Sequence, residues 1–102
     1  MKDLIRVKSL ISNEIEMLLN QQVKKEAYSS AVYLSMASWC NRNGYDFSYE
    51  YFFKQAEEDR QHQLKFYKYV LDMGGSAVSP EITGIKLEFN SFREVFEDAL
   101  DQ

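Results

Sequence analysis

Two long stretches of helical periodicity, separated by a short turn-forming segment, constrain the fold of this chain more than any other feature. The first stretch repeats in alternating steps of four and three residues, which is the spacing of a single helix face. The members of this stripe are Ile15, Leu19, Gln22, Glu26, Ser29, Tyr33, Met36 and Cys40. The pattern predicts a helix over residues 12–41 with Ser12 as its N-cap. A helix of about 28 residues is roughly 42 Å long, a length typical of helical bundles.

The second stretch predicts another long helix, over residues 46–74, with Asp46 or Ser48 as its N-cap. The members of its stripe are Phe52, Gln55 or Ala56, Asp59, His62, Phe66, Tyr69 and Met73. Gly44 lies between the two stretches and is suited to ending the first helix. Because this segment is too short to span the length of a helix, the two helices must lie antiparallel.

The rest of the chain predicts a crossover and the beginning of a third helix. Residues 75–90 include Pro80 and Gly84 and are too many for a tight turn, so we expect an extended crossover packed along the bundle. Ser91 and Glu94 have the spacing of a capping box, which predicts a partial third helix over residues 91–102.

The expected fold class is therefore all-α: a long antiparallel helical hairpin, a crossover and the start of a third helix. We expect a single domain over residues 1–102, of which 1–11 form an N-terminal tail. Two helices alone cannot bury both stripes. A complete four-helix bundle therefore requires self-association or further sequence.

Composition narrows the classes of function. The net charge of −4 argues against a nucleic-acid binder that relies on phosphate contacts. With Cys40 as its single cysteine, the chain cannot form an intrachain disulfide, and a reducing compartment is favoured. Residues 1–11 lack the pattern of a signal peptide, and no segment has the roughly 20 apolar residues of a membrane span. We therefore expect a soluble, cytoplasmic protein that has no nucleic-acid or membrane partner.

Polar side chains inside the two stripes are the feature that points to chemistry. Glu26 lies in the middle of the first stripe, and Asp59 and His62 lie three residues apart on one face of the second. Glu26 is 18 residues before Gly44 and Asp59 is 15 after it, so the two should lie at similar heights in the hairpin. A buried carboxylate requires an ion partner or a metal. A buried ion-pair network and a site for iron, manganese or zinc therefore both remain open.

Four segments of the chain resemble the non-haem ferritins. They are Glu26-Ala-Tyr-Ser-Ser-Ala-Val-Tyr33-Leu-Ser-Met, Ser38-Trp-Cys-Asn, Gln55-Ala-Glu-Glu-Asp-Arg-Gln-His62 and Gly74-Gly75. The similarity extends over most of residues 12–102 and corresponds to the N-terminal half of a ferritin. It implies a ferritin-like fold that binds a di-iron centre, oxidises Fe²⁺ with dioxygen or peroxide, and stores ferric iron in a homo-oligomer or cage.

The resemblance also assigns roles to residues. Glu26, Asp59 and His62 would form the first iron site of a ferroxidase centre, with Tyr33 beside it. Glu58 would contribute to an accessory iron site. Arg60 stands where haem-containing bacterioferritins carry an axial methionine, so no haem is expected.

Two departures from the ferritin pattern qualify these roles. The family usually has glutamate at the position of Asp59, and the shorter side chain puts the bridge between two irons in doubt. The third-helix glutamate of the second iron site would follow Gln102, so one chain supplies half a centre. A non-catalytic half-bundle that binds partners, and an inactive fragment of a longer ferritin, are therefore the alternative interpretations.

Overall fold

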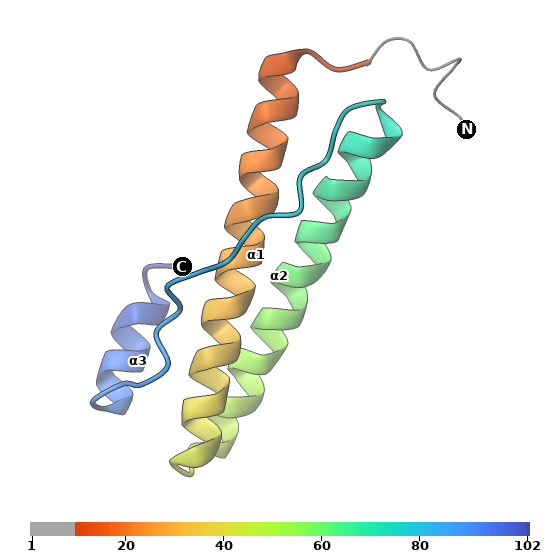
Figure 1. Cartoon of the computed structure of the whole chain (residues 1–102). Helices are drawn as coiled ribbons and strands as arrows, with labels where there is room; N and C mark the ends of the chain where they lie inside the picture. Colours follow the sequence, from red (N-terminus) through yellow and green to blue (C-terminus); the bar gives the residue numbers. More distant parts are fainter. Residues whose placement is uncertain (1–9) are drawn as a thin grey trace.

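The computed structural model describes residues 10–102 and is all-helical in this range, as predicted. Helix α1 spans Asn13–Arg42, α2 spans Asp46–Asp72 and α3 spans Phe92–Ala99. The two long helices form an antiparallel hairpin, and residues 75–90 run back beside α1 without helix or strand (Figure 1). None of the helices in residues 10–102 is apolar over a length sufficient to cross a membrane.

The turn of the hairpin depends on a glycine. Gly44 has φ of +81°, a left-handed backbone conformation that costs other residues free energy because their Cβ meets the backbone. On either side of it, the Asn43 N–H donates to Trp39 O at 3.1 Å and the Tyr45 N–H donates to Cys40 O at 2.9 Å. These bonds pair the last carbonyl groups of α1 and reverse the chain.

We expect Gly44→Ala to lower the free energy of unfolding by about 1–2 kcal/mol, the cost of a left-handed alanine. No atom lies within 4 Å of a Cβ built at this position, so the loss is conformational and not steric. Urea denaturation followed by circular dichroism measures it. Gly44→Asn is the control, since asparagine tolerates this conformation and should recover part of the loss. Equal stability of Gly44→Ala and the parent chain would contradict the argument.

The helix termini agree with the sequence only in part. Ser12 accepts a hydrogen bond from the Ile15 N–H at 3.2 Å and caps α1, as predicted. For α2 the prediction was wrong: the N-cap position is Tyr45, which makes no side-chain cap bond, and Asp46 already lies in the first turn. Packing explains the difference, because the Tyr45 ring stacks on Trp39 with centroids 5.7 Å apart. At its other end α2 stops at Asp72, two residues before the predicted end.

Helix α3 begins with a modified form of the expected capping box. Ser91 accepts from the Glu94 N–H at 3.2 Å, but the Glu94 carboxylate accepts from the backbone N–H of Asn90, at 3.3 Å, and not from that of Ser91. The helix ends at Ala99, before the predicted limit of 102. Its last turn tightens into hydrogen bonds between residues three apart, with the Gln102 N–H donating to Ala99 O at 3.2 Å.

The core lies at the turn end of the hairpin, where α1, α2, the end of the crossover and α3 meet. Its buried members are Met36, Ala37, Trp39, Cys40, Phe52, Phe89 and Val95. Farther from the turn only a narrow seam is buried, and it includes Val23, Ala27, Ala56 and Val70.

In part of each long helix, the buried residues are the immediate neighbours in sequence of the residues in the predicted stripe. On α1, Ala27 and Ser30 are buried, and Glu26 and Ser29 of the predicted stripe are half-buried beside them. On α2, Gln63 and Val70 are buried, and His62 and Tyr69 are exposed. Two packed helices bury only the line along which they touch. The broader stripes are of the width that a bundle of more helices covers.

The crossover is attached to α1 through its backbone. The Asn20 side chain donates to Ser76 O and accepts from the Val78 N–H, both at 2.9 Å, and the Glu16 carboxylate accepts from the Ser76 N–H at 2.7 Å. Near the turn, the Ser35 hydroxyl donates to Lys86 O and the Arg42 guanidinium donates to Leu87 O at 3.4 Å.

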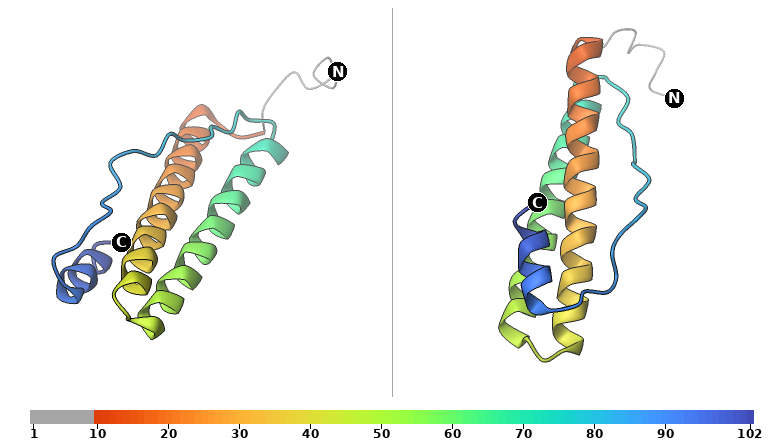
Figure 2. Two further views of the ribbon diagram at one scale, coloured as in Figure 1. Left: turned by 60° about the horizontal axis from the view of Figure 1, so that its bottom comes forward. Right: turned by 90° about the vertical axis from the view of Figure 1, so that its left-hand side faces the viewer.

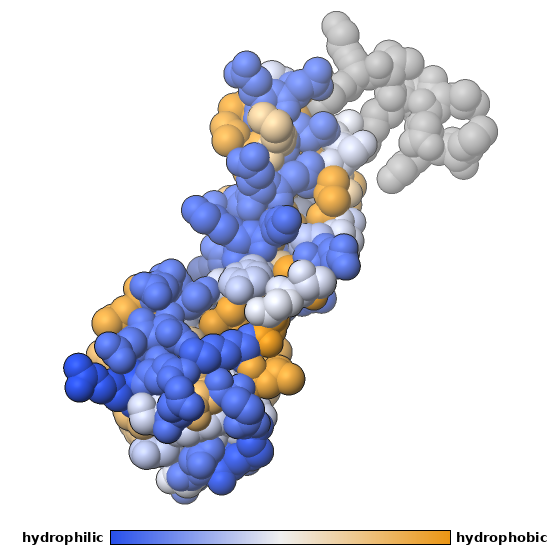
Figure 3. Space-filling view, turned by 60° about the vertical axis from the view of Figure 1, so that its left-hand side comes forward, coloured by the Kyte–Doolittle hydropathy of each residue, from blue (hydrophilic) through white to orange (hydrophobic). Residues whose placement is uncertain are grey.

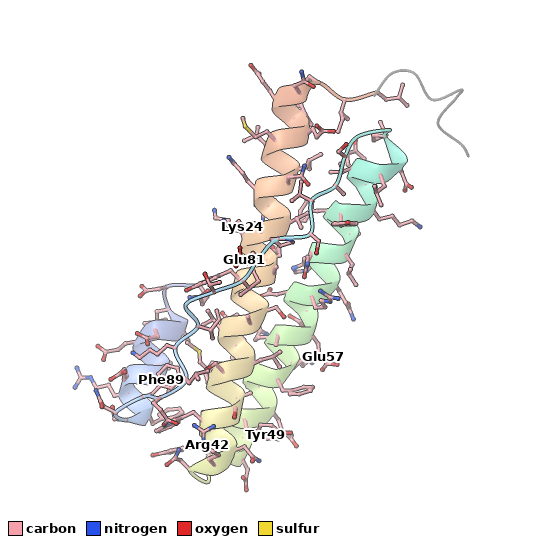
Figure 4. The ribbon with its side chains drawn as sticks, in the orientation of Figure 1. Lys24, Arg42, Tyr49, Glu57, Glu81 and Phe89 are labelled. Carbon is pink, nitrogen blue, oxygen red and sulfur yellow. The ribbon has the colours of Figure 1, made fainter. Side chains whose placement is uncertain are left out.

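These attachments set the path of the crossover along α1. It passes the level of Lys24, near Glu81, and reaches Phe89 close to the turn end of the hairpin (Figure 4).

The same attachments place α3 beside α1, on the side away from α2 (Figure 2). Lys86 pairs with the carboxylates of Glu94 and Asp98, the latter at 2.9 Å, and its ammonium lies 5.0 Å from the centroid of the Phe89 ring. The Phe92 ring stacks on Tyr45 at 4.7 Å. Helix α3 therefore starts near the turn and points back toward the middle of the hairpin.

Candidate metal centre

Three potential ligands converge halfway along the hairpin. Glu26 comes from α1, and Asp59 and His62 come from adjacent turns of α2. His62 Nδ1 lies 3.6 Å from Glu26 Oε2 and 3.9 Å from Asp59 Oδ1. One ligand atom from each residue lies within 4.8 Å of the others. These side chains therefore lie at similar heights in the hairpin, as the residue counts on either side of Gly44 predict.

Hydrogen bonds hold the second oxygen of each carboxylate. The Ser29 hydroxyl donates to Asp59 Oδ2 at 2.7 Å across the two helices, and the Gln22 amide donates to Glu26 Oε1 at 3.2 Å. Each carboxylate thus keeps one oxygen near His62. The carboxylate side chains are well covered, with 18% of Glu26 and 16% of Asp59 exposed, whereas 56% of the His62 side chain is exposed.

The distances within this group fit a metal better than a tight ion pair. At 3.6 and 3.9 Å, the imidazole is too far from either carboxylate for a hydrogen bond. Ligand atoms about 2.1 Å from a first-row metal lie roughly 3–4 Å from one another. The two distances from His62 Nδ1 fall in this range, and all three ligand atoms lie within 4.8 Å of one another. Two carboxylate oxygens and one imidazole nitrogen are a donor set suited to iron or manganese.

An open hollow of about 1060 Å³ lies beside this group. Glu26 and Tyr33 of α1, Asp59 of α2 and the chain's last two residues, Asp101 and Gln102, contribute to its lining. The sequence reasoning missed Asp101 and Gln102, because their approach depends on where α3 packs. Seen from the side of α3, the molecule is mostly hydrophilic, with hydrophobic side chains in separate patches (Figure 3).

Tyr33 lies between the carboxylates and the core. Its ring stacks on Phe52 with centroids 5.9 Å apart and planes inclined by 18°. Burial, followed by the negative charge of Asp59 and the proximity of Tyr51, raises the pKa of the Tyr33 phenol above its ordinary value. Tyr33 is therefore a neutral phenol near neutral pH, able to donate a proton or a hydrogen atom.

Glu58 and Arg60 point away from the convergent group. Each step along a helix turns the side chain by about 100°, so Glu58 faces a different direction from its neighbour Asp59. Glu58 is exposed and accepts a hydrogen bond of 3.4 Å from Gln55. Arg60 donates to the buried Gln63 at 3.1 Å and borders a different hollow. An accessory metal site at Glu58 therefore stays a prediction.

Comparison with known proteins agrees with this geometry. Residues 16–102 match the ferritin family, described as a ferritin-like domain. The chain is 36% identical over 93 residues to a bacterial non-heme ferritin of Staphylococcus epidermidis, and 37% identical over 93 residues to that of Staphylococcus saprophyticus. Each alignment covers 91% of this chain and 56% of the relative, so the chain spans about half the length of these proteins.

Solved structures give the same picture. A ferritin of Chlorobium tepidum superposes with a TM-score of 0.83 at 32% identity. An open-pore ferritin of the hyperthermophilic archaeon Archaeoglobus fulgidus superposes with a TM-score of 0.82 at 28% identity. Both superpositions cover 89% of this chain and 56% of the other, and the hairpin of α1 and α2 matches the ferritin hairpin.

Proposed function

This chain belongs to the ferritin family, and on that basis we propose that it binds iron, oxidises Fe²⁺ and serves iron storage. The observation that carries the proposal is the convergence of Glu26, Asp59 and His62 at metal-ligand spacing. Iron is the substrate of this site. We further propose the cytoplasm as its compartment, where the single free cysteine stays reduced.

In the proposed reaction two Fe²⁺ ions give one electron each to dioxygen: 2 Fe²⁺ + O₂ + 2 H⁺ → 2 Fe³⁺ + H₂O₂. The two carboxylates attract the cation and favour its more highly charged product. Ser29 and Gln22 orient these carboxylates in advance through the hydrogen bonds to their second oxygens. Tyr33 stands beside the site as a source of one further electron and proton.

The proposed roles of the three ligands differ. Glu26 and His62 would hold the same iron as terminal ligands, and Asp59 would hold that iron together with a second one. Asp59 Oδ2 accepts a hydrogen bond from the Ser29 hydroxyl. If Asp59 holds a second ion, this oxygen would be shared between Ser29 and that ion. Ser29 is therefore part of the proposed site through its hydrogen bond to the short Asp59 side chain.

We propose that a second copy of the chain completes the centre. One chain supplies two carboxylates and one imidazole, whereas two chains related by a twofold axis supply four carboxylates and two imidazoles. That set is typical of di-iron sites in helical bundles. The part of the hairpin that would face the second copy includes the half-buried Tyr33 and the exposed His62.

Anaerobic titration with Fe²⁺, combined with mass determination in solution, tests this function. We expect about one Fe²⁺ per chain and a dimer or larger assembly. Glu57→Gln is a matched control, because it removes an exposed carboxylate of the same helix that borders a different hollow and should leave this stoichiometry unchanged. Absence of stoichiometric binding would instead support a non-catalytic helical half-bundle, or a fragment that keeps the ferritin fold without its activity.

A further inference from the structure

A continuous row of aromatic rings leads from the candidate metal centre to the surface. Tyr33 of α1 stacks on Phe52 of α2, with ring centroids 5.9 Å apart. The Tyr51 ring meets Phe52 edge to face at a centroid distance of 5.4 Å and an interplanar angle of 73°. Tyr33 lines the hollow beside Glu26 and Asp59, Phe52 is buried and Tyr51 is 53% exposed, so the row runs from the candidate site to an exposed ring.

The chemistry of the three rings differs along the row. Tyrosine gives up an electron and a proton far more readily than phenylalanine does, so the two ends of the row can hold an oxidised state. Phe52 cannot hold one at the same potential, but its ring contacts both phenols and shortens the path for an electron between them. The exposed Tyr51 can release its proton directly to water, which the partly covered Tyr33 cannot do as freely.

We propose that Tyr51 is the exposed end of a redox relay that removes oxidising equivalents from the iron site by way of Tyr33 and Phe52. This inference rests on the proposed function and adds a residue to it. Hydrogen peroxide, the product of Fe²⁺ oxidation, is the oxidant. The relay makes Tyr51, and not a ligand of the iron, the residue that is finally oxidised.

The steps balance in atoms and electrons. At the site, H₂O₂ + Fe²⁺ + Tyr33-OH + H⁺ → Fe³⁺ + 2 H₂O + Tyr33-O•. The Tyr33 radical then takes an electron from Tyr51 and a proton from solvent, which restores Tyr33-OH. Tyr51-OH releases its proton to water and becomes Tyr51-O•. Two such radicals on different chains join through a carbon–carbon bond to form dityrosine.

The test uses the full chain, loaded with Fe²⁺ under anaerobic conditions and mixed with hydrogen peroxide. Freeze-quench electron paramagnetic resonance detects tyrosyl radicals, and dityrosine fluorescence together with denaturing gel electrophoresis detects cross-linked chains. We expect Tyr51→Phe to keep a Tyr33 radical that decays more slowly and to lose most of the cross-linked dimer. Tyr33→Phe should lose both signals.

Tyr69→Phe is the matched control, since Tyr69 also lies on α2, is 48% exposed and has no ring contact among residues 10–102. It should cross-link as the parent chain does. Unchanged cross-linking in Tyr51→Phe, or an equal loss in Tyr69→Phe, overturns the relay even when iron is oxidised normally. A parent chain that neither binds nor oxidises Fe²⁺ shows that the proposed function itself has failed.

Discussion

His62→Ala is expected to abolish rapid Fe²⁺ oxidation while the helix content of the chain stays unchanged. His62 is the single histidine of the chain and the one nitrogen donor of the convergent group. Loss of a hydrogen-bond partner of a metal ligand already costs roughly 10–100-fold in affinity or activity, and loss of the ligand itself should cost more. The fold should tolerate the change, because the side chain is 56% exposed and alanine favours helices.

Stopped-flow absorbance of the ferric product measures the rate, and far-ultraviolet circular dichroism measures helix content. Gln61→Ala is the control: it truncates the adjacent exposed side chain of the same helix and should oxidise Fe²⁺ at the parent rate. If His62→Ala unfolds, the imidazole has a structural role. If it is folded and oxidises Fe²⁺ normally, iron reacts elsewhere on the chain.

Met36→Ala should lower the free energy of unfolding by about 2–5 kcal/mol, the range for large-to-small substitutions in a packed core. Met36 is completely buried in the cluster where α1, α2, the crossover and α3 meet. Its truncation leaves a cavity that these rigid elements cannot readily close. The loss should also loosen α3, since the buried Val95 of α3 packs in the same cluster as Met36.

Urea denaturation of the two variants Met36→Ala and Leu34→Ala gives a matched comparison on one helix. Leu34 is 46% exposed, so its truncation removes a similar volume with little buried surface and should cost much less. Equal losses for both variants would mean that Met36 does not lie in the core of the folded chain.

Local signals in the sequence predicted the helices well. Ser12 and Ser91 cap their helices as their positions indicate, and Gly44 has the left-handed conformation that ends α1. The convergence of Glu26 with Asp59 and His62 followed from counting residues on either side of the turn. Each of these inferences needs only helix geometry, which depends on few residues at a time.

The features that the sequence did not predict depend on tertiary packing. Tyr45 occupies the N-cap position of α2 because its ring lies between those of Trp39 and Phe92, and Phe92 is 47 residues farther along the chain. The exposure of His62 also depends on tertiary packing. The predicted stripes are as broad as the face that a bundle of more helices would bury, whereas the hairpin buries only the line along which α1 and α2 touch.

The hydrogen bonds between α1 and the crossover affect how far the amino-acid sequence of the crossover can change. Asn20, Glu16 and Ser35 all bind backbone atoms of the crossover, which any amino acid other than proline at a donor position provides. The route is thus encoded mainly in α1, and the residues between Val78 and Lys86 are open to replacement except Gly84, whose φ of +73° favours glycine. This segment is the natural place to graft a foreign peptide onto the scaffold, because the helix beneath would hold its two ends.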